Sequence, residues 1–369
     1  MRRRRLNFIL IVQSILLLAH AFVYETWTSF WRAPDPPGVS ILAVAFAVLS
    51  VSFVTASLLA YRYDNMFVRA AYTAAATWLG LVNFCFLASL LCWLAYAGVR
   101  LARAPVAPRQ LATIFFGIAI AAGLYGTANS YWLRVKLVHV KLPNLPDAWR
   151  GRVAALVSDT HLGPIRTDRF SRRVVTVLNR HRPDVVFLAG DLYDGTAANV
   201  KLFAKPFADL IAPLGAYFVT GNHEEFSDPS QYINALACAS VRALQNEKVT
   251  IDGLQIVGVH YHDLSTPERF GAALRQADLD RRLPSILLAH APNRLWESER
   301  AGVTFQLCGH THAGQFFPWT LAVLRIYGKF AYGLQQLGDM TVYTSSGAGT
   351  WGPPVRLGTN PEVVLFHFD

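Results

Sequence analysis

Four long apolar runs occupy the first third of the chain and limit what it can fold into. They cover residues 6–24, 39–61, 70–99 and 111–130. Each run has about 20 residues or more, and at about 1.5 Å per residue such a helix crosses a bilayer core of roughly 30 Å. A helix buried in a soluble core rarely stays apolar on all sides over such a length. We therefore expect region 1–134 to form four transmembrane helices, with Pro34-Asp35-Pro36-Pro37 as a turn after the first.

The positive charge of the chain is concentrated in this apolar part. The net charge is +10, and residues 1–130 hold 10 Arg, no Lys and 3 acids, so they contribute +7 of it. Basic residues beside spans set the orientation of a membrane protein. The charge is therefore weak grounds for nucleic-acid binding, and we expect the lipid bilayer, and no nucleic acid, as a partner.

The basic residues beside the predicted spans also predict an orientation. Nine of them fall on the side of the N-terminus and four on the other side, which favours a cytoplasmic N-terminus. Four crossings then place residues 135–369 in the cytoplasm, on a multi-pass protein of the inner cell membrane. The first run could instead be a cleaved signal peptide, because Ala19-His20-Ala21 resembles a cleavage site. That alternative leaves the final side unchanged.

Residues 135–369 alternate short apolar runs with amphipathic stretches, which predicts a layered α/β domain. Helical spacing covers 169–181, 202–214 and 231–244, and further strands are expected at 250–259 and 341–344. Five apolar runs indicate buried, mainly parallel strands. These runs are Val153–Val157, Val185–Ala189, Tyr217–Val219, Ile286–Ala289 and Phe305–Cys308.

Five polar motifs stand at or near the ends of these runs. The carboxyl ends of parallel strands meet at one edge of a sheet, so we expect the polar side chains to converge there. Carboxylate, imidazole and amide groups suit a pair of divalent metal ions, and one carboxylate can bridge both. The motifs are Asp159-Thr160-His161, Gly190-Asp191-Leu192-Tyr193-Asp194, Gly221-Asn222-His223-Glu224, His290-Ala291-Pro292 and Gly309-His310-Thr311-His312.

The order of these motifs resembles that of the calcineurin-like metallophosphoesterases. The continuation Ala313-Gly314-Gln315 resembles their membrane-anchored bacterial branch. The resemblance implies a sandwich of two mixed sheets flanked by helices, holding two divalent ions (Mn, Fe, Zn or Co). It implies that the first ion is bound by Asp159, His161 and His312, and the second by Asn222, His290 and His310, with Asp191 as the bridge.

The same resemblance implies two catalytic residues that are not ligands. His223 would be the general acid for the leaving oxygen, or a stabiliser of the transition state, and Asp194 would orient it. The sequence departs from the phosphoprotein phosphatases of this superfamily, because Gly195-Thr196 follows where those carry Arg-Gly. A Ser/Thr phosphatase is therefore disfavoured.

We expect a membrane-bound hydrolase of a phosphodiester, phosphomonoester or pyrophosphate, with a lipid-linked substrate in view because the domain follows a span directly. The alternative is a sensor or transport scaffold that carries a regulatory phosphoesterase-like domain. Functional polar groups inside the spans would favour that alternative, but few exist, and Gln13 and Asn83 are the main ones.

Several other residues have more ordinary interpretations. Glu224 is expected to make local hydrogen bonds, and Arg166 to be a solvated surface residue, with a phosphate contact as its alternative. The stretch His260-Tyr261-His262-Asp263 is expected to be an ordinary loop, or else to touch the substrate. The aromatic stretches 316–319 and 351–354 either close the core or contact the membrane or a lipid.

Overall fold

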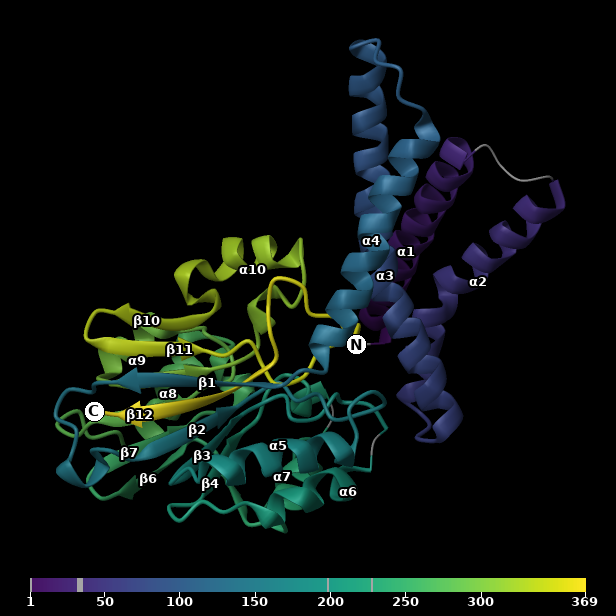
Figure 1. Cartoon of the computed structure of the whole chain (residues 1–369). Coiled ribbons are helices and arrows are strands. Elements are labelled where there is room, and N and C mark those ends of the chain that lie inside the picture. Colours follow the sequence, from purple (N-terminus) through teal and green to yellow (C-terminus); the bar gives the residue numbers. More distant parts are fainter. Residues whose placement is uncertain (1, 32–35, 198, 227) are drawn as a thin grey trace. The chain divides into compact units, whose positions relative to one another are not determined.

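A computed structural model describes residues 2–31, 36–197, 199–226 and 228–369, and the chain forms two compact units (Figure 1). The helical unit comprises Met1–Ala128 together with Gly352–Val355. The globular unit comprises Asn129–Trp351 and Arg356–Asp369. The division expected after residue 134 stays a prediction.

Four long helices form the helical unit, which confirms the predicted fold class at this end of the chain. They are α1 (Arg2–Trp31), α2 (Pro36–Ala60), α3 (Met66–Leu101) and α4 (Pro108–Ser130). Each is long and apolar enough to cross a membrane. Of the turn expected at 34–37, Pro34 and Asp35 lie outside the described residues, while Pro36 and Pro37 begin α2. Proline is tolerated there because the first amide groups of a helix have no partner within it.

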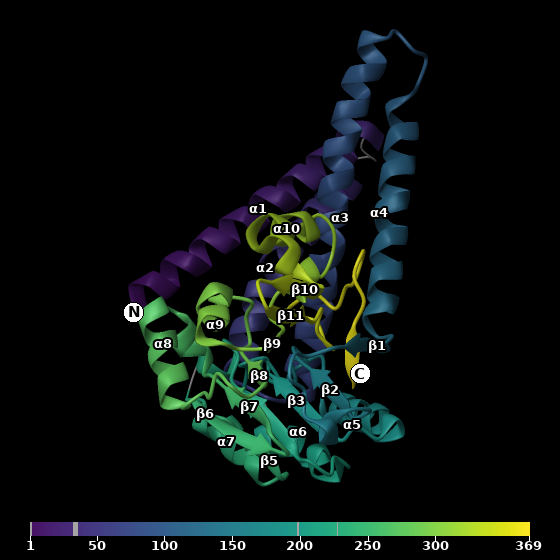
Figure 2. The same cartoon turned by 90° about the vertical axis from the view of Figure 1, so that its left-hand side faces the viewer.

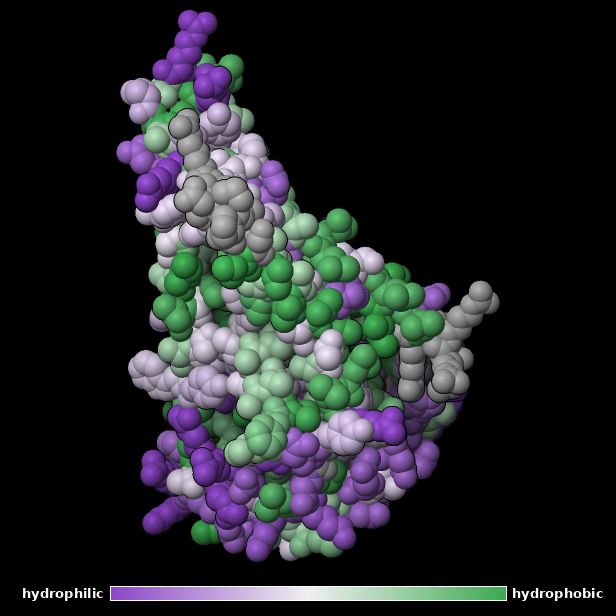
Figure 3. Space-filling view, turned by 90° about the vertical axis from the view of Figure 1, so that its right-hand side faces the viewer, coloured by the Kyte–Doolittle hydropathy of each residue, from purple (hydrophilic) through white to green (hydrophobic). Residues whose placement is uncertain are grey.

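Many large apolar side chains of these helices are exposed, among them Phe8, Leu18, Ile41 and Leu94, and hydrophobic residues gather across the middle of the face drawn in Figure 3. Such exposure suits lipid, where an apolar surface costs nothing. Polar contacts between helices are few but definite: the indole nitrogen of Trp78 donates to His20 at 2.8 Å, and that of Trp93 donates to Thr26 at 2.9 Å. His20 thus joins α1 to α3, a buried polar contact that the sequence-based reasoning did not foresee.

Two six-stranded mixed sheets build the globular unit, as predicted (Figures 1 and 2). The first sheet has the order β1-β12-β2-β3-β4-β5. Strands β2 to β5 run parallel, whereas β12 is antiparallel to β2. The bounds are β1 (Arg134–Val140), β12 (Glu362–Phe368), β2 (Val153–Val157), β3 (Val185–Ala189), β4 (Ala216–Val219) and β5 (Val241–Ala243).

The second sheet has the order β10-β11-β9-β8-β7-β6, with the four central strands parallel and both edge strands antiparallel to their neighbours. An apolar core fills the space between the two sheets, where Leu156 and Phe187 of the first meet Ile286 and Leu307 of the second. The bounds are β6 (Glu247–Ile251), β7 (Leu254–Gly258), β8 (Ser285–Leu288), β9 (Phe305–Cys308), β10 (Gly333–Leu337) and β11 (Met340–Thr344).

Helices cover the outer face of each sheet, so two further apolar layers form. One joins the first sheet to α5 (Asp168–His181), α6 (Val200–Ala204) and α7 (Ser230–Ala237). The other joins the second sheet to α8 (Pro267–Gln276) and α9 (Leu295–Ala301). The remaining helices are α10 (Trp319–Tyr327) and the 3-10 turns η1 (Asp147–Trp149), η2 (Lys205–Asp209), η3 (Glu224–Phe226), η4 (Tyr261–Leu264), η5 (His312–Gly314) and η6 (Gly328–Ala331).

Three predicted elements were wrong in extent. The helix expected over 202–214 is the short α6 followed by η2, because Pro206 has no amide hydrogen to continue the α-helix. The helix expected over 231–244 ends at Ala237, and β5 follows after Ser240 takes a left-handed conformation. The strand expected over 250–259 is a hairpin, since Asp252 and Gly253 both have positive φ and form a two-residue turn between β6 and β7.

Candidate metal centre

The carboxyl ends of five strands deliver the predicted polar residues to one edge of the sandwich. Strands β2, β3 and β4 are parallel neighbours in the first sheet, and β8 and β9 are parallel neighbours in the second. Each of the five motifs lies in the loop that leaves one of these strands. Residues 151 positions apart in the sequence are therefore within contact distance of each other, as the hydrogen bond from the His310 amide to Asp159 shows.

One group of three ligands comprises Asp159, His161 and His312, whose donor atoms all lie within 4.8 Å of one another. The Nε2 atoms of His161 and His312 are 3.0 Å apart. Nε2 of His312 lies 3.5 Å from Oδ1 of Asp159. Two donors about 2.1 Å from a shared cation and at right angles are separated by about 3.0 Å. This spacing fits one cation held by all three side chains.

A second group of three comprises Asp191, His290 and His310. Nε2 of His290 is 3.1 Å from Oδ2 of Asp191, and Nδ1 of His290 lies 2.7 Å from the carbonyl oxygen of Ala189. A donated hydrogen at Nδ1 directs the lone pair of Nε2 into the site, as in many metal centres. Asn222 joins this group, because its Oδ1 lies 2.9 Å from Nδ1 of His310.

Asp191 connects the two groups. Its Oδ2 lies 3.1 Å from Nε2 of His290 in the second group and 4.0 Å from Nε2 of His161 in the first. Its Oδ1 accepts a hydrogen bond of 2.9 Å from the amide of His223. A carboxylate in this position can offer an oxygen to each of two cations.

The pKa values of the histidines in the two groups also suit the binding of cations. Burial lowers the pKa of His310 to about 4, and it lowers the pKa of His161 as well, so both imidazoles are neutral and able to bind a metal. Burial alone would lower the pKa of His290, but Asp191 and Asp159 raise it to about 10. A proton on His290 thus supplies positive charge among these carboxylates when no metal ion is bound.

Five residues of the cluster have a strained backbone. A non-glycine residue with positive φ costs about 1 kcal/mol or more and persists only where surrounding contacts enforce it. Here the loop after β2 is tied to the loop after β3, because the amides of Asp159 and His161 donate to the carbonyls of Gly190 and Asp191. The positive φ angles are those of Asp159 (52°), His161 (47°), Asp191 (50°), His310 (69°) and His312 (49°).

Glycine is required directly beside two of the carboxylates. A Cβ atom on Gly221 would collide with the carboxylate of Asp191, and one on Gly309 would collide with the carboxylate of Asp159. Both carboxylates therefore occupy space that any side chain at these positions would fill. The glycines that precede the polar residues in these two motifs make room for the donor atoms.

Glu224 has a larger part than the sequence indicated. Its buried carboxylate accepts three backbone hydrogen bonds, from the amides of Asp191 (2.9 Å), Tyr193 (2.9 Å) and Gly221 (2.7 Å). These amides belong to the loops after β3 and β4, so one side chain joins two ligand-bearing loops. Its place directly after Gly221-Asn222-His223 was the only signal for this role in the sequence.

His223 and Asp194 lie beside the first group of ligands. Nδ1 of His223 is 3.0 Å from the main-chain carbonyl oxygen of Asp194 and 3.9 Å from its Oδ1. The same Oδ1 lies closer, at 3.6 Å, to Nδ1 of His161. Burial raises the pKa of Asp194 to about 7. Asp194 thus contacts His223 mainly through its backbone, while its carboxyl group lies between two imidazoles.

Tyr261 also borders the cluster, with its ring 5.7 Å from that of His290 and 5.9 Å from that of His310. It lies in η4, within the stretch 260–263 that was expected to be an ordinary loop or a substrate contact. Sequence reasoning emphasised the two histidines of that stretch, but the tyrosine between them is the residue that reaches the ligands.

Two arginines of the globular unit are buried, and one of them contacts the loop that carries His312. Arg356 donates to the carbonyl oxygens of His312 (2.9 Å), Ser346 (2.6 Å) and Gly349 (2.6 Å). Arg166, expected on the surface, is buried instead: it donates to the carbonyl of Ser130 at 2.6 Å, and its guanidinium lies over the rings of Tyr131 and Phe170. The expectation of a solvated Arg166 was wrong because its stacking partner Tyr131 is distant in sequence.

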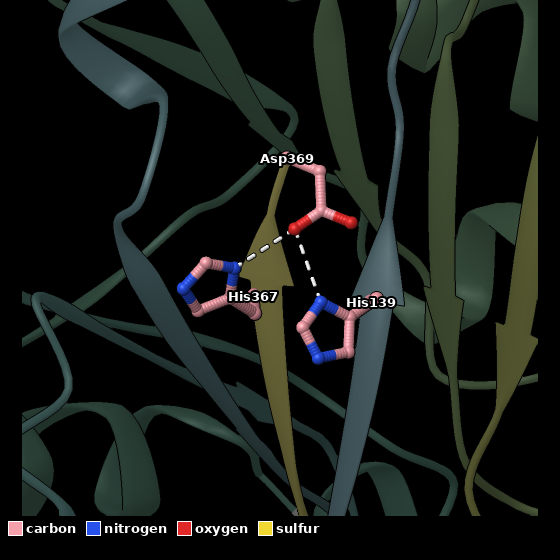
Figure 4. Close-up of side chains that lie close together, drawn as sticks. All are labelled: His139, His367 and Asp369. Atoms are coloured by element: carbon pink, nitrogen blue, oxygen red, sulfur yellow. Dashed lines mark hydrogen bonds and ion pairs between the residues drawn. The ribbon is translucent and has the colours of Figure 1, made fainter.

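Another group of possible ligands lies at the opposite end of the first sheet (Figure 4). His139 of β1 is paired in register with His367 of β12, and Nδ1 of each imidazole lies 3.0 Å from Oδ1 of Asp369. Because β12 is antiparallel to β2, this group lies at the edge where β2 begins, whereas Asp159 follows the end of β2. His139 and Asp369 are exposed and His367 is half-buried, and this group is separate from the two groups of ligands described above.

Two mixed sheets with paired groups of Asp, His and Asn at one edge define a class of protein. The calcineurin-like phosphoesterase family matches residues 153–314, the part of the chain that contains all five motifs. Relatives that are 31% and 33% identical over most of their own length lead to the same conclusion, and the chain belongs to this family of metallophosphoesterases.

The relatives include proteins with and without a matching helical region. A Bos taurus protein named "Transmembrane protein with metallophosphoesterase domain" is 31% identical over 97% of this chain and 88% of its own. A Danio rerio protein of the same name is 27% identical over the same shares. An uncharacterized metallophosphoesterase of Aquifex aeolicus is 33% identical over 67% of this chain and 96% of its own. The similarity to the first two therefore extends through the four helices.

Proposed function

We propose that this protein hydrolyses phosphate esters with the help of two divalent cations. Asp159, His161 and His312 would hold the first cation. Asn222, His290 and His310 would hold the second, and Asp191 would contact both. The observation that carries the proposal is the close grouping of these donor atoms, two sets within 4.8 Å joined by one carboxylate.

The donor set suits several metals. Imidazole, carboxylate and amide oxygen together tolerate Mn, Fe, Zn or Co, so the ligands alone leave the metal open. Bound divalent cations would supply Lewis acidity: they polarise a phosphoryl group and lower the pKa of water. The chain's own groups provide a buried set of fixed donors that loses little energy to reorganisation when charge develops.

His223 would act on the leaving oxygen through its Nε2 atom. Its Nδ1 faces the carbonyl of Asp194, so the hydrogen at Nδ1 is committed and donation from Nε2 requires the imidazolium form. Burial lowers the pKa of His223, while the carboxylates of Asp191 and Asp194 raise it. The net effect is a lowered pKa, so the two carboxylates only partly offset burial in keeping the charged form that would release a proton to an alkoxide.

We further propose that the substrate is lipid-linked, a phosphodiester or a pyrophosphate. The globular unit begins at Asn129, within the last turn of the fourth membrane-type helix, so the site is tethered to the bilayer by a minimal connection. The basic residues beside the helices favour the cytoplasmic face of the inner cell membrane.

The test is the Asp191→Asn variant of the full chain, purified in detergent and loaded with Mn²⁺. We expect hydrolysis of bis(p-nitrophenyl) phosphate by the wild type. We expect a loss of at least about a thousandfold in the variant, because Asn at position 191 cannot supply the shared negative charge. Such a loss corresponds to about 4 kcal/mol, at about 1.4 kcal/mol for each factor of ten in rate. Asp278→Asn, a change at an exposed carboxylate, is the matched control and should keep its activity.

The competing function is a sensor or scaffold with an inactive phosphoesterase-like domain. Under that function, the metal-loaded wild type would be inert on every phosphoester offered to it. Mass spectrometry of lipid extracts incubated with the wild type and with Asp191→Asn separates the two functions. A lipid consumed only by the wild type would identify the physiological substrate, whereas no change in any lipid would favour the sensor or scaffold.

A further inference from the structure

Helix α10 presents an apolar surface that the globular unit leaves uncovered. None of its nine residues is buried, and its main contacts are with the short turns η5 and η6. We call the following five side chains the α10 surface. They are Phe317 (46% exposed), Trp319 (54%), Leu321 (58%), Leu324 (55%) and Ile326 (71%).

The composition of this segment is that of a helix at a membrane interface. Large aliphatic side chains are combined with Trp319 at one end and Tyr327 at the other, and both aromatic types favour the boundary between lipid and water. Arg325 and Lys329 follow at the carboxyl end of the helix and suit anionic lipid headgroups. A soluble surface rarely exposes so many large apolar side chains together.

The globular unit is fastened close to the point where the chain leaves the last span. Asn129 and Ser130 end α4, and both are bound inside the globular unit. The amide of Asn129 donates to the carbonyl of Arg356 at 3.0 Å, and the carbonyl of Ser130 accepts from Arg166 at 2.6 Å. The bilayer surface therefore lies within a few residues of these anchors.

The segment after α10 contacts β1, the strand that follows the last span. Six residues after Ser130, the amine of Lys136 in β1 donates to the hydroxyl of Tyr332 at 3.0 Å and lies 4.4 Å from the centre of its ring. Six residues of extended chain span at most about 20 Å. With the reach of the Lys136 side chain added, the hydroxyl of Tyr332 is within about 30 Å of the end of the span, so the bilayer is an apolar partner within reach.

The same segment is bound to the metal centre. The hydroxyl of Thr311, between His310 and His312, donates to the carbonyl of Ala331 in η6 at 2.7 Å. The ring of Tyr327, the last residue of α10, lies 6.4 Å from the ring of His310. A surface that enters the headgroup layer would therefore hold these ligands beside it.

We propose that the α10 surface inserts into the headgroup region of the bilayer and holds the mouth of the metal centre against the membrane. The partner is a lipid bilayer containing anionic headgroups. One consequence rests on the proposed function: a phosphoester at a lipid headgroup would reach the site without its acyl chains leaving the bilayer. The insertion itself does not depend on hydrolysis.

Spin labels test the insertion directly in the full chain. Cys238, the exposed cysteine, is replaced by Ser, and labelled Cys is introduced at Leu324 or at Ile211. Ile211 is the matched control because it is 62% exposed and lies just before β4, at the edge of the first sheet away from the site. The protein is placed in nanodiscs of phosphatidylcholine with phosphatidylglycerol.

Collision with oxygen and with a water-soluble nickel chelate is then measured for each label. We expect the label at 324 to collide more with oxygen, which concentrates in lipid, and the label at 211 to collide more with the nickel chelate. Equal, water-like accessibility at both positions would overturn the proposal. This readout needs no enzymatic activity, so it stands even if the protein proves inert.

A second measurement uses two substrates with the same leaving group. The double variant Leu321→Glu with Leu324→Glu should hydrolyse soluble bis(p-nitrophenyl) phosphate like the wild type. On a diacylglyceryl 4-nitrophenyl phosphodiester in vesicles, we expect it to be at least about tenfold slower, because two carboxylates oppose insertion. An equal loss on both substrates would contradict the membrane role, whereas a wild type inert on both would contradict the proposed function instead.

Discussion

Replacing Glu224 by Gln tests whether one buried carboxylate holds two ligand-bearing loops together. Oε2 accepts from the amides of Asp191 and Gly221, and Oε1 accepts from the amide of Tyr193. Glutamine has the same shape but only one acceptor oxygen. If that oxygen takes the place of Oε2, two hydrogen bonds remain, and the NH₂ group faces the amide of Tyr193, where two donors oppose each other.

The expected cost follows from this geometry. A hydrogen bond to a charged acceptor contributes about 1.5–3 kcal/mol, and at least one is lost while a buried amide is left without a partner. The reverse orientation of the glutamine would lose two, so the first is preferred. For a domain of this size, a loss of about 2 kcal/mol lowers the melting temperature by roughly 4–8 °C.

The assay is thermal unfolding of the full chain in detergent, followed by intrinsic fluorescence, with Glu225→Gln as the matched control. Glu225 accepts one hydrogen bond from the hydroxyl of Thr220 at 2.8 Å, which Gln can also accept. Metal affinity should fall about 10- to 100-fold in Glu224→Gln, because the amide of Tyr193 loses its acceptor and the loop that carries Asp191 is held less firmly. A melting temperature within about 1 °C of the wild type would refute the reasoning.

Three further predictions concern the proton, the leaving group and the buried arginine. Asp191 and Asp159 raise the pKa of His290 to about 10, so at pH 8 the metal-free imidazole is protonated, and metal binding should release about one proton from it. Calorimetry in buffers of different ionisation enthalpy measures this release, and binding heats that do not depend on the buffer would contradict it. His223→Ala should lower the rate of hydrolysis of esters with poor leaving groups by about 10²–10⁴ but that of 4-nitrophenyl esters less, because nitrophenolate departs without a proton. Equal losses of rate across a series of leaving groups would exclude a general acid. Arg356→Lys should weaken metal binding about tenfold or more, because a single amine cannot reproduce the contacts to His312, Ser346 and Gly349. Equilibrium dialysis would measure the metal affinity, and an unchanged affinity would show that Arg356 does not support the ligands.

Much of the fold could be predicted because its signals are local. The four spans follow from the length of the apolar runs, and strands such as β2 and β9 follow from short apolar runs that end in polar motifs. Where a signal was ambiguous, tertiary pairing decided. The residues after Ala237 suit a helix by spacing, but β5 forms there because Val241 and Ala243 pair with β4.

The candidate site divides in the same way. Asp159, Asp191, Asn222 and the histidines were predicted from the sequence, and they lie at one edge because each follows a strand and the strand ends of a parallel sheet share that edge. Glu224 and Tyr261 were underestimated, because their partners are 30 or more residues away, and no local pattern indicates three amides converging on one carboxylate.

The order and spacing of side chains along the chain were sufficient for the membrane class, the layered α/β domain and the set of polar residues. The two-sheet sandwich followed from the resemblance to the calcineurin-like metallophosphoesterases. Only the tertiary structure decided which donors share a group, that Arg166 is buried against Tyr131, and that the α10 surface stays uncovered. These are properties of distances between remote segments. Such distances are set by how sheets and loops pack, which the spacing of residues along the chain does not specify.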